Sequence, residues 1–472
     1  MRPLVDAGSG KFPVVKVLRS RACALLFACF ISGGPVQAEE PWRLKDALAL
    51  PSWMALEVQH RLRYESIDGQ YRAGGEGGDQ QLALQTLAHL KLGGPTLKLG
   101  LEMLDARVFL DDAASTLDPG MVNSAELLQG YIEWQPDLGA TQGTMAVKAG
   151  RQTIDFGTRR LIARNRFRNT VNAFNGLDVR FTSAAGHESE AFVVVPVIRL
   201  PTQRSRLEDN DASFDEEDFG TVLWLASWRS APGPVRVEAY LIGLNETDGV
   251  FDTRNRRLQT PGLRLFREPA PGHLDFQLEL VQQLGEIRGS TARSDRADLD
   301  HHAHYESLQL GYTFDALWSP RVVAMFDYAS GDEDPADGEN QRFDTLYGAR
   351  RFEYGPSGIF GPFLRTNMLT PGWRLNVSPQ DGLQAFIGHR AYWLASDRDI
   401  WLAANLRDTT GQAGSFIGHQ IEACATWQLV PGNLVLEAGG AWLSEGEFRE
   451  AEQGRADPGA SSYLYTQLTL SY

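Results

Sequence analysis

The feature that most constrains this chain is a recurring segment of roughly ten residues in which apolar and polar side chains alternate. In residues 54–65, for example, Leu56 and Val58 fall on one face of an extended strand while Glu57 and Gln59 fall on the other. A membrane-spanning strand needs this pattern because one face meets lipid and the other meets the lumen. The alternation therefore predicts β-structure, either in a membrane barrel or in a soluble β-sandwich, which alternates comparably.

The connections between these segments separate the two folds. Short connections, such as Gly93-Gly94-Pro95 and Val430-Pro431-Gly432, consist of residues that form tight turns. They alternate with much longer ones, of which the longest runs from Ser330 to Thr370. Outer-membrane barrels have short periplasmic turns and long extracellular loops. The order of connections therefore favours a barrel.

The predicted fold class is all-β, a single transmembrane antiparallel β-barrel of about 18 strands with both termini in the periplasm. A barrel of this size is wide enough to leave an aqueous lumen. The predicted strands are residues 54–65, 81–92, 96–107, 126–134, 144–152, 175–183, 188–197, 219–229, 235–245, 258–267, 273–284, 303–314, 320–329, 371–377, 383–394, 417–429, 433–443 and 461–472.

Residues 1–38 have the pattern of a cleavable secretory signal peptide. Five basic residues precede or flank an apolar run from Ala22 to Ile31, and the small-residue site Val36-Gln37-Ala38 follows it. Lipidation at Cys29 is the alternative. The sequence thus predicts a mature protein that consists of one barrel domain, residues 39–472.

The mature chain is strongly acidic. Loss of five basic residues and one acid with the signal moves the formal charge from -15 to about -19, which argues against a nucleic-acid partner. Two of the three cysteines lie in the signal, so Cys424 has no partner for an intramolecular disulfide. Outer-membrane lipid and lipopolysaccharide are the surroundings that a barrel of this kind implies.

Residues 151–180 reverse this charge locally, because they contain seven arginines and only two acids. The planar guanidinium group of arginine can donate two parallel hydrogen bonds to one carboxylate. A lumenal cluster would bind and orient polyanions, whereas an external one would contact lipopolysaccharide phosphates. Strand parity places further arginines on inward faces. The candidate substrate-binding residues of the lumen are Arg61, Arg63, Arg151, Arg160, Arg168, Asp178, Arg180 and Arg374.

The run from Asp327 to Glu339 is acidic, and its carboxylates Asp332, Asp334 and Asp337 could in principle bind Ca²⁺. The run lacks the spacing of a calcium loop, so a solvated external loop is the preferred interpretation. No cofactor is expected. No local catalytic motif is present, and the sequence does not predict an enzyme.

Several segments resemble the alginate export family of outer-membrane proteins. They are Gly150-Arg151-Gln152, Phe156-Gly157, Arg160-Leu161-Ile162, Phe167-Arg168-Asn169-Thr170, Phe174-Asn175-Gly176, Asp327-Tyr328-Ala329-Ser330-Gly331-Asp332, Phe343-Asp344-Thr345-Leu346-Tyr347-Gly348 and Ile417-Gly418-His419-Gln420-Ile421-Glu422. The resemblance implies a monomeric barrel of 18 strands with an arginine-lined constriction. It also implies export of a polyuronate such as alginate, with a periplasmic scaffold lipoprotein and an inner-membrane synthase as partners.

Two other functions remain open from the residues themselves. The same barrel would serve as a diffusion porin that takes up small anionic nutrients or oligosaccharides. A plugged barrel whose long loops bind surface glycans is the third possibility. The best-known member of the resembled family restricts its pore with an extracellular loop and a long periplasmic turn, but the late periplasmic turns are short here.

Overall fold

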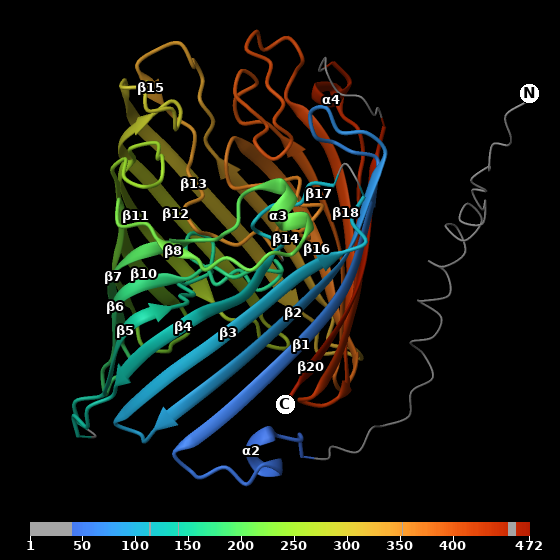
Figure 1. The fold of residues 1–472 in the computed structure, drawn as a ribbon. Coiled ribbons are helices and arrows are strands. Elements are labelled where there is room, and N and C mark those ends of the chain that lie inside the picture. The colour runs from blue at the N-terminus through green and yellow to red at the C-terminus, as the bar shows by residue number, and fades with distance from the viewer. Residues whose placement is uncertain (1–39, 113–114, 140, 352, 452–458) are drawn as a thin grey trace, which may run out of the picture. The chain divides into compact units, whose positions relative to one another are not determined.

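The computed structural model describes residues 40–112, 115–139, 141–351, 353–451 and 459–472. The predicted signal peptide lies outside these described residues. Eighteen strands form a closed antiparallel barrel in which each strand pairs with its neighbours along the chain (Figure 1). Pairing of the first strand with the last, from Gln59 opposite Ser471 to Asp68 opposite Ser462, closes the ring.

The barrel strands are β1 (Met54–Asp68), β2 (Gly78–Gly93), β3 (Leu97–Phe109), β4 (Asn123–Trp134), β5 (Thr144–Gln152), β6 (Phe174–Thr182), β7 (Glu188–Ile198), β9 (Thr221–Arg229), β10 (Arg236–Glu246), β11 (Arg257–Arg267), β12 (Leu274–Arg288), β13 (Asp298–Thr313), β14 (Arg321–Ala329), β16 (Met368–Gln380), β17 (Leu383–Trp393), β18 (Phe416–Val430), β19 (Leu434–Leu443) and β20 (Ser461–Ser471). Two-residue strands β8 (Glu216–Glu217) and β15 (Glu339–Asn340) extend the sheet, and the described helices are α2 (Leu44–Ala47), α3 (Arg204–Glu208) and α4 (Glu447–Ala451). None of these helices is long and apolar enough to cross a bilayer.

The predicted fold class is confirmed, and each predicted strand matches one barrel strand. The largest differences are at extracellular strand ends. β13, for example, begins at Asp298 rather than at residue 303. Its first outward-facing residues, Asp298, Asp300 and His302, are polar, whereas the later outward-facing residues Leu308 and Leu310 are apolar. The sequence pattern therefore underestimates the length of the strand.

The two faces of the wall follow the alternation. In β1, Leu62 and Tyr64 are each 42% exposed on the outer face, whereas Arg63 and Glu65 are fully buried on the inner one. Trp373 of β16 is likewise on the outer face, and Arg374 points inward. Apolar side chains therefore meet the membrane, and the charged side chains of the wall lie in the lumen.

Two long connections fold into the lumen. The first inner loop, residues 153–173, joins β5 to β6, and the second inner loop, residues 341–367, joins β15 to β16. Their apolar side chains pack against inward side chains of the wall: Phe156 on Tyr240 and Phe167 on Tyr465, with ring centroids 5.2 and 5.3 Å apart. The lumen is consequently not the open aqueous pore expected from strand number, because packed loops occupy part of it.

Candidate functional site

The two inner loops meet each other inside the barrel. Tyr347 of the second loop donates its backbone N–H to the carbonyl of Leu161 (2.9 Å) and accepts from the N–H of Ala163 (3.1 Å). Ala349 adds a third bond, to the carbonyl of Arg159 (2.9 Å). Backbone pairing of this kind satisfies polar groups that would be costly to bury unpaired. It makes the crossing of the loops a fixed constriction.

A buried carboxylate reinforces this crossing. Glu353 of the second loop forms ion pairs with Arg365 of the same loop and with Arg160 of the first, the latter at 2.6 Å. Arg160 also pairs with Glu279 of β12 at 2.5 Å. Burial alone would raise the pKa of Glu353, but the guanidinium groups of Arg160 and Arg365 outweigh it and lower this pKa to about 2. The constriction is therefore tied electrostatically to the barrel wall.

Arginines of β1 hold the first inner loop from the opposite wall. Arg61 donates to the backbone carbonyls of Arg166 (2.6 Å) and Arg168 (2.7 Å). Arg63 donates to the carbonyl of Phe167 (2.5 Å) and forms a buried ion pair with Glu65 at 2.6 Å. Because these bonds use main-chain acceptors, Arg61 keeps its positive charge without a carboxylate partner among the described residues.

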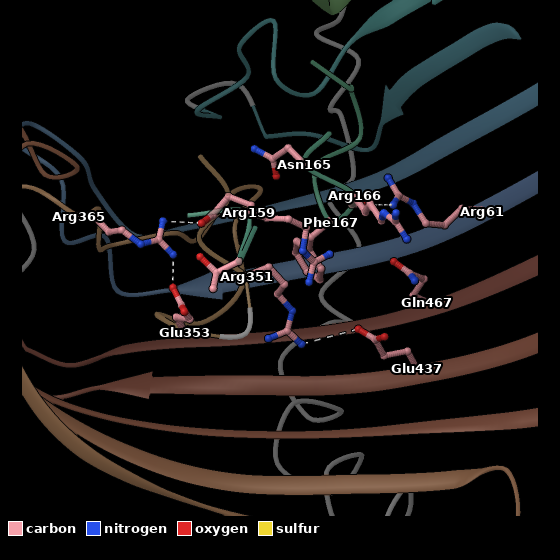
Figure 2. A pocket seen from close by; sticks show the side chains of 12 residues that line it. Arg61, Arg159, Asn165, Arg166, Phe167, Arg351, Glu353, Arg365, Glu437 and Gln467 are labelled. Atoms are coloured by element: carbon pink, nitrogen blue, oxygen red, sulfur yellow. Dashed lines mark hydrogen bonds and ion pairs between the residues drawn. The ribbon is translucent and has the colours of Figure 1, made fainter. Parts of the chain in front are cut away.

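A cavity lies on the periplasmic side of the crossing, between the inner loops and the wall (Figure 2). Its wall residues Glu437 and Gln467 belong to the periplasmic halves of β19 and β20. Five arginines and two glutamates carry its charge, so the lining is net positive. We call it the periplasmic cavity; its lining is Arg61, Thr158, Arg159, Asn165, Arg166, Phe167, Ala349, Arg351, Glu353, Arg365, Glu437 and Gln467.

The arginines of the periplasmic cavity differ in how far they are neutralised. Arg351 pairs with Glu422 of β18 at 2.5 Å, and Figure 2 shows it directed also toward Glu437. By contrast, the Arg159 side chain has no ion pair with any described residue, and Arg159 adopts a positive φ of 66°. Arg159 and Arg61 therefore supply the uncompensated positive charge of this cavity.

A second cavity lies on the extracellular side. The connections that follow the extracellular ends of β3 and β7 contribute to it, together with both inner loops. We call it the extracellular cavity. Its charged lining residues are Asp118, Arg168, Arg199 and Arg350.

The residues expected from the sequence to bind substrate lie at several depths in the barrel. Arg61 lines the periplasmic cavity and Arg168 the extracellular one. Arg160 lies at the constriction between them, where it is 1% exposed. Arg63 is buried in the wall, and Arg374 stacks over Phe386 with 4.3 Å between its guanidinium carbon and the ring centroid. The sequence thus identified one residue of each cavity.

The other three expected residues also line neither cavity, and they lie away from the constriction. Asp178 and Arg180 share the inner face of β6, as predicted, but they pair with each other at 3.0 Å near its periplasmic end. Arg151 of β5 is paired in register with Asn175 of β6, and its guanidinium forms ion pairs with Glu126 at 2.5 Å and Glu217 at 2.9 Å. Its position at the extracellular end of β5 explains this pairing.

Sequence reasoning missed the arginines of the second inner loop and its neighbours. The adjacent pair Arg350-Arg351 and the later Arg365 all reach the lumen, as does Arg199 after β7. A signal for two of them was present, because two consecutive arginines stand within the longest connection of the chain. Nothing in the local pattern, however, indicated that this connection folds inward.

The described residues contain no group of three or more His, Cys, Asp or Glu side chains that could hold a metal ion. Asp332 instead donates its N–H to Asp399 Oδ2 at 3.0 Å, and the carboxylate of Asp334 accepts from the N–H of Ala336. The weak calcium interpretation of Asp332, Asp334 and Asp337 therefore gains no support.

Known structures share this fold at low sequence identity. OccAB3 from Acinetobacter baumannii matches with a TM-score of 0.56 and 12% identity over 89% of this chain and 99% of that one. OpdK from Pseudomonas aeruginosa, solved with vanillate, matches with a TM-score of 0.54 and 13% identity, again over 89% and 99%. A BenF-like porin from Pseudomonas fluorescens Pf-5 gives 0.55 and 12% over the same shares.

No curated protein sequence matches the chain significantly. The family model described as alginate export, in contrast, matches residues 52–461. This match covers nearly the whole barrel, including both inner loops and the motifs around Arg151 and Asp327 on which the resemblance rested. The chain belongs to the alginate export family and is an outer-membrane β-barrel channel.

Proposed function

We propose that this channel passes anionic sugar chains, a polyuronate such as alginate or its oligomers, across the outer membrane. The observation that carries the proposal is the net positive lining of both cavities, one on each side of the constriction. The chain is strongly acidic, with a formal charge of -15, so solubility does not explain why arginines are buried in its lumen. Their cost is offset if they attract and orient carboxylates.

The proposed path has sites of graded strength. Arg61 and Arg159 offer charge that no described carboxylate neutralises, whereas Arg351 and Arg365 are already paired with Glu422 and Glu353. A conducting path requires sites attractive enough for entry and weak enough for release. Paired arginines next to unpaired ones would let a carboxylate exchange partners without being trapped.

Uptake of small anionic nutrients is the second candidate. The constriction of two packed inner loops favours it, because a narrow passage suits compact solutes at least as well as a polymer. A structural relative, OpdK, was solved with vanillate. Export and uptake use the same passive pore, so the two candidates differ in solute size and direction rather than in the chemistry of the lining.

The experiment is block of single-channel current by oligogalacturonates of two to six residues, compared with neutral oligogalactosides of the same lengths. The double variant Arg61→Gln and Arg159→Gln should lose anion selectivity and weaken block by about tenfold or more, because each charge-assisted hydrogen bond contributes about 1.5–3 kcal/mol. The matched control is Arg293→Gln, which removes an exposed loop arginine paired with Asp252.

Block that strengthens with chain length favours the polyuronate, since a longer chain would occupy both cavities at once. Block that is strongest for the monomer favours small-anion uptake. Equal selectivity and block in the double variant and the wild type would overturn the proposal for Arg61 and Arg159.

A further inference from the structure

The extracellular cavity contains three guanidinium groups for which the described residues provide no ion pair. Arg168, Arg199 and Arg350 approach it from the first inner loop, from the connection after β7 and from the second inner loop. No carboxylate of a described residue lies within 4.0 Å of their nitrogens. Many other lumenal arginines are neutralised by a carboxylate of the wall or of a loop: Arg63 by Glu65, Arg160 by Glu279, Arg365 by Glu353 and Arg390 by Asp327.

A fixed amide aligns two of the three groups. Asn172 donates through Nδ2 to the carbonyls of Ala163 (2.9 Å) and Tyr347 (3.3 Å), so its orientation is set by both inner loops. Its Oδ1 then accepts from Arg168 (2.5 Å) and Arg199 (2.8 Å). Asn172 is only 8% exposed. This arrangement brings two positive charges to one oxygen that carries no charge.

The remaining bonds of these arginines also go to uncharged acceptors. Arg199 Nε donates to the carbonyl of Pro119 (3.0 Å), and Arg350 donates to the carbonyl of Gly361 (2.9 Å). The Nε of Arg168 is buried without a hydrogen-bond partner among the described residues. A buried N–H of a charged group without an acceptor is costly, and bound ligands or water usually supply the missing partner.

The acidic residue of the cavity does not cancel this charge. Asp118 lines it, is exposed, and accepts the backbone N–H of Gly120 through Oδ1 at 2.5 Å. Three guanidinium groups against one carboxylate leave an excess of two positive charges. An anion that carries two carboxylates would therefore neutralise the cavity.

We infer that the extracellular cavity is a discrete binding site for a pair of carboxylates, such as those of two adjacent uronate residues, entered from outside the cell. The inference rests on the proposed function for the class of solute and adds a site, its residues and its side. Planar guanidinium forks bind carboxylate oxygens in pairs, so two carboxylates would share Arg168, Arg199 and Arg350.

The test measures block of the full-length barrel in planar bilayers by digalacturonate, added to either side. Galacturonate, neutral galactobiose and sulfate are the comparison solutes. The wild type should be blocked at lower concentration by digalacturonate than by galacturonate, and from the extracellular side. In Arg199→Gln with Arg350→Gln, the half-blocking concentration from that side should rise at least tenfold, with block from the periplasmic side unchanged.

Two single variants should change the half-blocking concentration from the extracellular side in opposite directions, and both keep all three arginines. Asn172→Asp places a carboxylate between Arg168 and Arg199 and should weaken extracellular block. Asp118→Asn removes the competing charge, keeps the oxygen that accepts from Gly120, and should strengthen it. The matched control is Arg257→Gln, whose side chain pairs with Glu286 and Asp298 at the extracellular rim.

The outcomes separate this inference from the proposed function. An anion-selective wild type whose extracellular block is unchanged in all of these variants overturns the binding site and leaves the channel proposal intact. A wild type without anion selectivity overturns the channel proposal itself. Sulfate that blocks as strongly as digalacturonate, with the same dependence on Arg199 and Arg350, overturns the carboxylate pair in favour of a general anion site.

Discussion

Glu353 is the residue on which the two inner loops depend most directly. It joins Arg160 of the first loop to Arg365 of the second, and removal of one partner from a buried ion pair costs about 3–5 kcal/mol. Glu353→Gln should therefore loosen the crossing and raise both single-channel conductance and current noise. A variant with wild-type conductance and noise would show that the backbone pairing alone holds the loops.

The pH dependence of this crossing follows from the same ion pairs. The pKa of Glu353 is lowered to about 2, so its stabilisation is complete above the ordinary carboxyl value near 4.5 and is lost only as pH falls through about 2. The difference in conductance between the wild type and Glu353→Gln should consequently stay constant between pH 7 and pH 4.5. Bilayer recordings of both proteins across this range check the prediction, and a change in that difference near pH 5 would contradict it.

Gly348 tests how closely the loops approach each other. A Cβ at this position would contact the backbone carbonyl of Arg160, leaving no space for a side chain. Gly348→Ala should separate the loops at a cost of about 1–3 kcal/mol, the usual range for overpacking, and enlarge the passage. Gly94→Ala, at a turn with open space around it, is the matched control. Equal conductance of the two variants would mean that the loops do not limit the current.

At the level of single residues, the sequence predicted which face of a strand an arginine lies on better than it predicted the ion-pair partner of that arginine. Alternation placed Arg61, Arg63 and Arg374 on the inner face correctly, because side-chain direction on a strand is a local property. Which arginine remains unpaired depends on carboxylates far away in sequence, as with Arg160 and Glu279. The same holds for Arg151, whose partners Glu126 and Glu217 come from other elements.

At the level of elements, the strands were predictable and the inner loops were not. Each strand must present one apolar face to lipid, so the alternation that predicts the strand is found in its own sequence. The second inner loop enters the lumen because Phe360 and Phe363 find aromatic partners on the wall, Tyr463 and Tyr392. Such partners are recognised only when the barrel is closed, and the sequence alone does not indicate them.

Shortening the second inner loop tests whether the strands form the barrel independently of this loop. Replacement of residues 353–363 by a short glycine and serine linker removes Glu353 and the aromatic anchors but no barrel strand. The barrel should still assemble, since strand pairing is independent of the loop, and conductance should rise severalfold with reduced block by oligouronates. A shortened channel with unchanged conductance and block would exclude this loop as the constriction.

At the scale of the whole molecule, the barrel combines an acidic chain with a lumen whose two cavities are net positive. The family match and the strand pairing establish an outer-membrane channel. Solute and direction are proposals, because a passive pore has the same structure for both directions of flow. We propose that the positive cavities on both sides of the constriction select carboxylated sugars.

The most direct test is the reversal potential of the wild-type channel in a salt gradient, followed by addition of oligogalacturonate and then of the matched neutral oligogalactoside. With positive charge in both cavities, the reversal potential should lie toward that of the anion, and only the oligogalacturonate should block the current. A cation-selective current, or equal block by the charged and the neutral sugar, would contradict it.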